Sequence, residues 1–166
     1  MNPIDMKFVD GSVLFCSCKK PHGIVDRIAV RVSGCDLVHA CLFLQDMVVY
    51  EATFPRVCKH PWIEWLPDFR TSRFKDQDLF VMVPNVPYSE DELARILEFA
   101  EDQQHRRYKA RGIWQERETS GTYCSQFVSE VIEKSGRIVS VHHANLPGVL
   151  LEQVEGWSHR VDVPKE

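Results

Sequence analysis

The chain contains 166 residues, which is enough to enclose one hydrophobic core and too few to favour two domains. Its formal net charge is −4 and its basic residues are scattered, a pattern that argues against a nucleic-acid-binding protein. No apolar run approaches the ~18 residues of a membrane helix, and residues 1–5 lack the pattern of a signal peptide. We therefore expect one cytoplasmic domain over residues 1–166, with signal-independent export left open.

Short β-prone runs along the chain predict an antiparallel sheet. Asp10-Gly11 is a turn signal before the first run, and Gln45-Asp46 separates two longer runs that read as a hairpin. The predicted strands cover residues 13–16, 38–44, 47–52, 57–59, 79–83 and, more weakly, 157–163.

Helical spacing of apolar residues predicts two well-defined helices. One begins at Ser89, which forms a capping box with Glu92, and should end near His105. The other covers residues 123–135, carries one apolar stripe and stops at Gly136. Further helical segments are expected at residues 23–32, at residues 62–66 as a single turn, and from residue 145 onward. Helices and strands in this order predict an α+β domain.

Cys124 is the strongest candidate for a reactive group. It lies at the start of the helix over residues 123–135, where unpaired N–H groups and the helix dipole favour a thiolate and offer donors to an oxyanion. A cysteine on an apolar stripe is more often a small buried hydrophobe, so a catalytic role requires a base and a group to orient that base.

His39 and Glu51 are the candidates for those two roles, because each is an ionisable residue in an otherwise apolar strand. A two-residue hairpin loop would put Glu51 across from Ala40, on the opposite face from His39. A three-residue loop over residues 44–46 would put Glu51 directly opposite His39 on one face. A triad therefore predicts a three-residue loop or an equivalent bulge, in which Asp46 adopts the left-handed conformation.

The remaining histidines give weaker signals. The His142-His143 pair lies in a predicted loop, where exposure is the ordinary expectation. No partner is evident from the sequence for the other four, which are His22, His60, His105 and His159.

The six cysteines are expected to be reduced, because the chain lacks a secretion signal. Cys16 and Cys18 would be able to share a metal with His22, Cys35, Cys58 or His60. Their spacing matches no common zinc pattern, so we expect buried thiols, no metal and no cofactor.

Three motifs resemble a known family. The opening Asp10-Gly11-Ser12-Val13-Leu14-Phe15, the pair of strands with Val38-His39 and Tyr50-Glu51-Ala52, and the helix start Tyr123-Cys124-Ser125-Gln126 are similar to motifs of the circularly permuted NlpC-type, papain-like cysteine hydrolases. The likeness is greatest to the YiiX-like branch, and the histidine precedes the cysteine as in that permuted order. The resemblance implies an α+β papain-like core, in which an antiparallel sheet carrying the base packs against the nucleophile helix.

The resemblance also implies roles for individual residues. Cys124 would be the nucleophile, His39 the base and Glu51 the orienting group. Tyr108, Tyr123 and Cys41 would line the substrate site.

The chain departs from the family pattern at four positions. Arg106 and Lys109 replace the glycine and aspartate that flank the family's tyrosine segment. Cys41 stands where a glycine is usual, and Gln126 replaces a glutamate. These departures leave the three proposed catalytic residues in place and affect the expectation about substrate.

Three functions remain open at this point. The first is a cysteine amidase or peptidase that cleaves a small amide or isopeptide bond through a thioester, with a peptidoglycan-type, N-acyl or lipid-linked substrate. The second is a thiol-dependent acyltransferase or thioesterase, a related group that tends to use a second histidine where this chain has Glu51. The third is a binding module with Trp62, Trp65 and Trp114 as aromatic contacts, although core packing is the ordinary expectation for these side chains.

Overall fold

The computed structural model describes residues 2–18, 27, 36–72, 76–108, 122–137 and 147–165. Apart from residue 27, the helix expected at residues 23–32 lies outside these ranges, and so do His22, Cys35, Trp114 and the His142-His143 pair. In the described part of the chain, no helix combines the length and the apolar character that crossing a bilayer requires.

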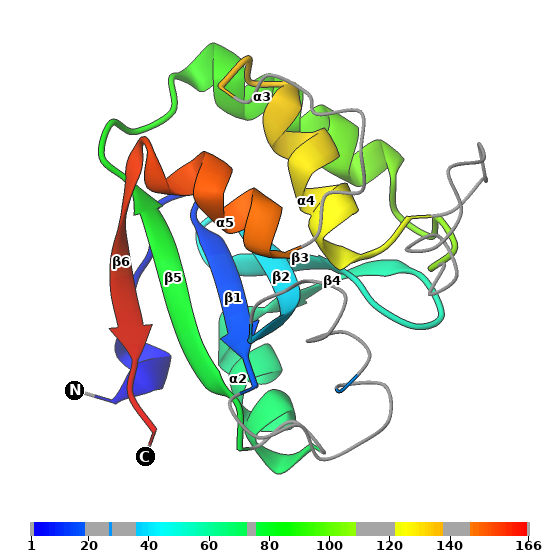
Figure 1. Cartoon of the computed structure of the whole chain (residues 1–166). Coiled ribbons are helices and arrows are strands. Elements are labelled where there is room, and N and C mark those ends of the chain that lie inside the picture. Colours follow the sequence, from blue (N-terminus) through cyan, green and yellow to red (C-terminus); the bar gives the residue numbers. More distant parts are fainter. Residues whose placement is uncertain are drawn as a thin grey trace.

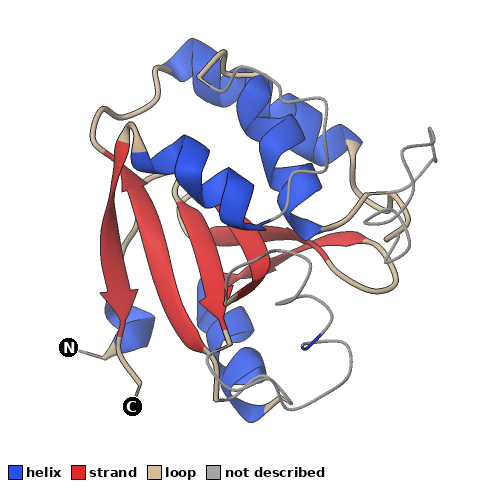
Figure 2. Cartoon of the chain, viewed as in Figure 1, coloured by secondary structure: helices blue, strands red, loops and turns tan. Residues whose placement is uncertain are grey.

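The centre of the molecule is a six-stranded antiparallel sheet with the order β4-β3-β2-β1-β5-β6. Helices cover both of its faces (Figures 1 and 2). The strands are β1 (Val13–Ser17), β2 (Leu37–Leu44), β3 (Val48–Ala52), β4 (Val57–Pro61), β5 (Asp78–Pro84) and β6 (Ser158–Val163). Every predicted strand is confirmed within one or two residues of its predicted bounds. The mixed α+β class is therefore confirmed.

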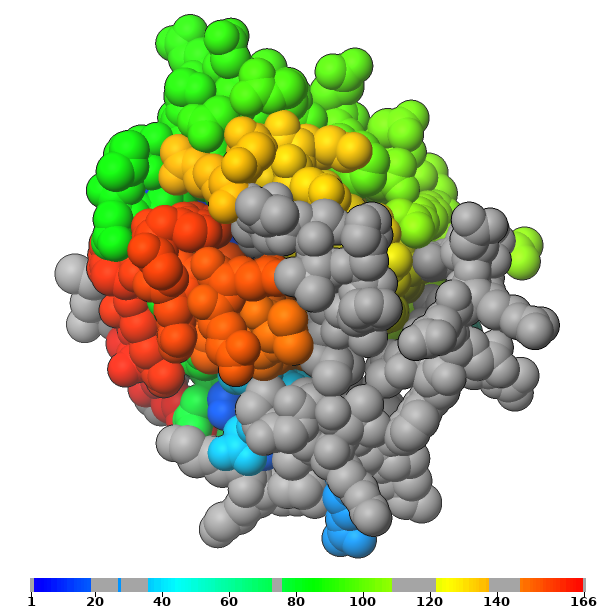
Figure 3. Space-filling view, turned by 45° about the horizontal axis from the view of Figure 1, so that its top comes forward, coloured from blue at the N-terminus to red at the C-terminus, as the bar shows by residue number. Residues whose placement is uncertain are grey.

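Three helices form the layer on one face of the sheet. They are α3 (Glu90–Asp102), α4 (Cys124–Glu133) and α5 (Pro147–Glu155). Figure 3 brings this layer forward, with α3 in green, part of α4 in yellow and α5 in orange to red on the same face. Beneath it lies an apolar core built from alternate residues of the central strands, including Phe15, Leu42 and Tyr50.

The opposite face is covered by α2 (Trp62–Thr71), with the short 3-10 helix η1 (Pro3–Asp5) beside it (Figure 1). The prediction of a single turn at residues 62–66 is wrong, because the helix continues through Pro67. Trp65 and Phe69, one turn apart, are both buried against the sheet, and this packing outweighs the helix-breaking tendency of proline. The expected core packing of Trp62 and Trp65 is confirmed, since each is less than a tenth exposed.

The capping and turn signals in the sequence coincide with the observed ends of helices and strands. The Ser89–Glu92 capping box is present, with both reciprocal hydrogen bonds, at the start of α3. Gly136 adopts φ +84° after the end of α4, and Gly11 adopts φ +84° in the turn before β1. A Cβ atom on Gly11 would lie 2.2 Å from the Tyr88 ring, so this turn has no room for a side chain.

Candidate active site

Cys124 is the first residue of α4, and Tyr123 is the N-cap with no side-chain capping bond. The backbone N–H groups of Ser125 and Ala40 donate to the Cys124 sulfur. One of these donors belongs to the helix itself and the other to β2, on which α4 packs. The sulfur is therefore held at the junction of the helix start and the sheet.

A bulge in β2 determines where the His39 side chain points. Cys16 of β1 pairs with His39, but the next residue, Ser17, pairs with Leu37, so Val38 is an extra residue in β2. Val38 packs on the α2 side and Ala40 on the α4 side, so the alternation of faces breaks at His39. Bulges re-aim side chains in this way, and here the ring lies between the two layers.

The β2–β3 hairpin brings Glu51 onto the same face as Cys41. Its loop has three residues, as predicted, but they are 45–47 and not 44–46, because Leu44 pairs with Val48. The expectation that Glu51 lies directly opposite His39 is therefore wrong by two residues. Continuing the register puts Glu51 across from Cys41, diagonal to His39, which is still within side-chain reach. Asp46 has the expected left-handed conformation, with φ 53°.

The two strands no longer pair beyond this point, and the site lies past their last pair. The β2–β3 ladder ends at the pair Leu42–Tyr50, although both strands continue past it. The Ala40 N–H donates to the Cys124 sulfur and not to a β3 residue within this ladder. The end of the pairing thus lets a side chain from the α4 layer approach groups that belong to the α2 side.

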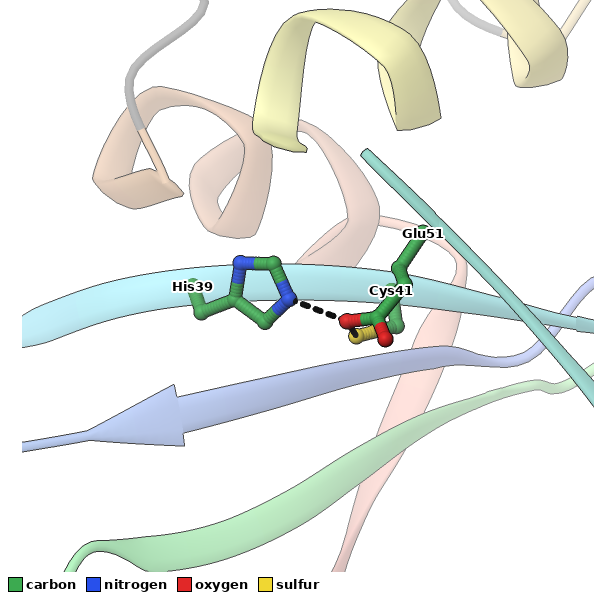
Figure 4. A group of neighbouring side chains, drawn as sticks. All are labelled: His39, Cys41 and Glu51. Carbon is green, nitrogen blue, oxygen red and sulfur yellow. Dashed lines mark hydrogen bonds and ion pairs between the residues drawn. The ribbon is translucent and has the colours of Figure 1, made fainter. Parts of the chain in front are cut away.

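Glu51 is the centre of the hydrogen-bond network on the α2 side (Figure 4). Its Oε2 lies 2.7 Å from Nε2 of His39, and the Cys41 thiol donates to the same oxygen over 3.6 Å. The indole N–H of Trp65 donates to Oε1 over 3.0 Å. The side chains of His39 and Glu51 are 21% and 10% exposed, so this pair is shielded from bulk water.

The electrostatics favour a charged pair of Cys124 and His39. Burial opposes a low pKa for Cys124, but the charge and hydrogen bond of His39 and the two backbone N–H donors lower that pKa below the usual thiol range. Burial alone would lower the pKa of His39, but the sulfurs of Cys41 and Cys124 more than offset it, and the pKa lies well above the usual histidine range.

The pKa values of the neighbouring thiols are raised, whereas that of Cys124 is lowered. Burial raises the pKa of Cys16 to about 12 and that of Cys58 to about 11, and it raises the pKa of Cys41 well above the usual range. Cys124 is the thiol whose pKa is lowered, so its thiolate and the Glu51 carboxylate are negative groups beside the protonated His39 ring. The pKa of Glu51 is lowered: burial would raise it, but hydrogen bonds from His39, Trp65 and Cys41 outweigh that effect.

The three residues expected to bind substrate lie around this network in different ways. Tyr108 is close enough to Cys124 and His39 to interact with both electrostatically, although burial is the main reason that its pKa is raised. Tyr123 directly precedes the sulfur-bearing residue and is buried. Cys41 is fully buried, and its thiol contacts Glu51.

Two of the departures from the family pattern form a connection between the tyrosine segment and α4. Arg106 pairs with Glu130 over 2.5 Å, and Gln126 donates to the other oxygen of the same carboxylate over 2.8 Å. Arg106 and Gln126 both bind Glu130 of α4, so these two replacements form a structural contact between the tyrosine segment and the helix. Lys109 lies outside the described residues.

Two clusters in the described ranges bring together side chains that could ligate a metal. One comprises His39, Cys41 and Glu51, and the other comprises Glu51, Cys58 and His60. Cys16 and Cys18 belong to neither cluster. Among the described residues, these two cysteines therefore do not form the shared metal site that the sequence left open. Of the other histidines considered, His159 lies on β6, bonded to Asn85.

Trp65 is the site residue that the sequence did not reveal. The sequence predicts core packing or an aromatic contact for its indole, and the ring is stacked between Trp62 and Phe69. What is new is the hydrogen bond from its N–H to Glu51. A buried indole usually has an acceptor, so a glutamate on an adjacent apolar strand was the available signal.

Comparisons with known proteins identify the fold of the chain but assign it to no family. No family model and no curated protein matches the chain. The chain is similar to the crystal structure of metalloprotein yiiX from Escherichia coli O157:H7, with a TM-score of 0.59 and 16% sequence identity. The match covers 96% of this chain and 91% of that one. The chain therefore has a YiiX-like fold.

Proposed function

We propose that the chain is a papain-like cysteine hydrolase of the permuted NlpC type, which cleaves a small amide or isopeptide bond. The observation that carries this proposal is the position of one imidazole: His39 hydrogen-bonds the Cys124 sulfur and, through Nε2, the Glu51 carboxylate. Hydrolysis by a cysteine nucleophile requires this arrangement, in which the nucleophile contacts the base and the base contacts an orienting group.

Acylation would begin with attack of the Cys124 thiolate on the substrate carbonyl carbon. The charge that develops on the carbonyl oxygen would be stabilised by backbone N–H groups at the start of α4, beginning with that of Cys124, because the N-cap Tyr123 makes no side-chain bond to them. Protonated His39 would then give its proton to the leaving nitrogen as the C–N bond breaks. The products of this step are a free amine and a thioester on Cys124.

Deacylation would use the same groups in reverse. His39, now neutral, would take a proton from a water molecule that attacks the thioester carbonyl. The C–S bond would break, releasing a carboxylic acid and restoring the thiolate beside the imidazolium. Glu51 would hold the ring orientation in both steps through its 2.7 Å contact with Nε2. Tyr108 and Tyr123 are the described side chains best placed to contact the acyl part of the substrate.

The similarity to a metalloprotein supports a second candidate, a metal site at the same place. His39, Cys41 and Glu51 offer one nitrogen, one sulfur and one carboxylate oxygen within 4.8 Å of one another, a donor set that suits zinc. An ion there would act as a Lewis acid on a bound water. It would occupy the imidazole and the carboxylate that the hydrolase needs, so the two candidates exclude each other at this cluster.

A trapping experiment distinguishes these candidates. The metal-free protein is incubated with small N-acyl amides and activated acyl esters, and intact-mass spectrometry records the acyl adduct before and after treatment with hydroxylamine, which cleaves thioesters. We expect one hydroxylamine-sensitive adduct, mapped to Cys124 and absent from Cys124→Ala. Lack of an adduct in the metal-free protein, with hydrolysis appearing only after zinc is added, would instead support the metal candidate.

A further inference from the structure

Beside the proposed catalytic network, the edge of the sheet carries a second group of possible ligands. β4 is the edge strand, and its residue Cys58 lies directly opposite Glu51 of β3. His60 is two residues further along β4, so it points to the same face as Cys58. The ligand atoms of these three side chains all lie within 4.8 Å of one another.

We propose that Glu51, Cys58 and His60 form a zinc site at this edge of the sheet. One thiolate, one imidazole and one carboxylate are a typical donor set for zinc, and they do not suit magnesium or calcium, which prefer oxygen ligands. Tetrahedral zinc with bonds of about 2.0–2.3 Å places its ligands roughly 3.3–3.8 Å apart, so closing the site requires movements of about 1 Å. Small rotations of the partly exposed Cys58 and the exposed His60 side chains would supply them.

Accessibility favours this cluster over the one formed by His39, Cys41 and Glu51. Cys41 has no exposed surface, and the His39 side chain is 21% exposed. By contrast, Cys58 is half-buried and His60 is exposed. An ion from solvent would meet His60 and Cys58 first and then the buried Glu51 carboxylate, and water would complete the coordination. With a thiolate and a carboxylate as ligands, the bound dication leaves no net charge to bury.

Glu51 belongs both to this zinc site and to the proposed catalytic network, so zinc binding should affect the reactivity of Cys124. Zinc on Glu51 neutralises the negative charge that holds the His39 ring beside Cys124. Zinc binding should therefore slow the reaction of Cys124, an effect that rests on the proposed function. Metal binding itself does not rest on it, because Cys58 and His60 take no part in the proposed hydrolysis.

Cobalt binding tests the site without any reference to activity. Metal-free full-length protein, kept reduced, is titrated with Co²⁺ while the thiolate-to-cobalt charge-transfer band is recorded, and Zn²⁺ affinity is then measured by competition. We expect one equivalent to bind, loss of the band in Cys58→Ser, and at least about tenfold weaker binding in His60→Ala. His159→Ala, which changes the same residue type elsewhere, should bind as the unchanged protein does, and Cys41→Ser, which keeps a donor beside Glu51, should retain the band.

Two results would overturn the proposal. One is a charge-transfer band that survives in Cys58→Ser and disappears in Cys41→Ser, which would move the metal to the buried cluster. The other is the absence of any band in the unchanged protein.

Iodoacetamide alkylation of Cys124, with and without saturating Zn²⁺, tests the coupling. Slowing by zinc that disappears in Cys58→Ser and His60→Ala supports the shared carboxylate, whereas equal slowing in both variants contradicts it and points to zinc on Cys124 itself. A Cys124 that is unreactive without metal would refute the hydrolase and leave the cobalt result intact.

Discussion

The two faces of the sheet bury different kinds of side chain. Under α3, α4 and α5 the strands contribute a core of aliphatic and aromatic residues. Under α2 the strands also contribute the Cys16 and Cys41 thiols, and the Glu51 carboxylate is bonded by an α2 indole. The sulfur of Cys124 comes from the first layer and the Glu51 carboxylate from the second, and the His39 ring lies between them. The apolar face therefore supplies stability, and the proposed chemistry is confined to the region where β2 and β3 no longer pair.

The largest effect should come from the histidine that connects the two layers. We expect His39→Ala to slow alkylation of Cys124 at pH 7 by about 10²–10³-fold, because the thiolate loses its charged partner and the base is gone. His60→Ala, on the same side of the sheet, is the matched control and should react at the normal rate in the absence of metal. Equal rates for both variants would show that His39 does not activate the sulfur.

Glu51→Gln should have the next largest effect and should also shift the pH profile. Loss of the carboxylate lowers the pKa of His39, the weaker imidazolium stabilises the thiolate less, and the pKa of Cys124 rises. The alkylation profile therefore moves to higher pH, and the rate at pH 7 falls by about 10–100-fold. Glu101→Gln, a carboxylate bonded to Lys59 and Tyr50 away from the sulfur, should leave the profile unchanged.

Trp65→Phe tests whether α2 contributes only packing. The substitution keeps an aromatic ring and removes the donor to Glu51 Oε1, so we expect a several-fold lower alkylation rate and a smaller shift of the profile in the same direction as in Glu51→Gln. Trp62→Phe loses a comparable bond, from its indole to the Pro3 carbonyl, and serves as the control. If the two variants have the same profile, Trp65 is structural and does not position the carboxylate.

The smallest effect on reactivity should come from the apolar side. Ser89→Ala removes the N-cap of α3 and should lower the free energy of unfolding by about 1 kcal/mol, as measured by urea denaturation. Ser89→Thr keeps a hydroxyl cap and should lose less. Alkylation of Cys124 should be the same in both. A changed rate in Ser89→Ala would contradict the division of roles between the two faces.

Local sequence signals predicted much of this fold because they act over a few residues. The capping box at Ser89, the turn at Gly11 and the apolar runs of the strands each correspond to an observed element. The length of α2 was not predictable from the same signals, because the packing of Phe69 on the sheet continues the helix beyond Pro67. Tertiary contacts of this kind leave no local signature.

The site was predictable as a set of residue types and not as a geometry. The sequence left two lengths open for the hairpin loop, and a triad required the three-residue loop that would put His39 and Glu51 on one side; the hydrogen bond between them is present. The sequence did not reveal that the loop is shifted along the chain, that a bulge at Val38 turns the ring, or that Trp65 reaches the carboxylate. Register, bulges and contacts between elements depend on how the whole sheet packs.

The most direct test of the central claim compares two thiols in one experiment. Alkylation of the metal-free protein is followed by peptide mapping across a range of pH, so that Cys124 and Cys58 report side by side. The account predicts that Cys124 reacts with a midpoint below the usual thiol range, whereas Cys58 reacts only at high pH, in line with its pKa of about 11. Coincident profiles for the two cysteines, or a midpoint for Cys124 at or above the usual thiol range, would contradict it.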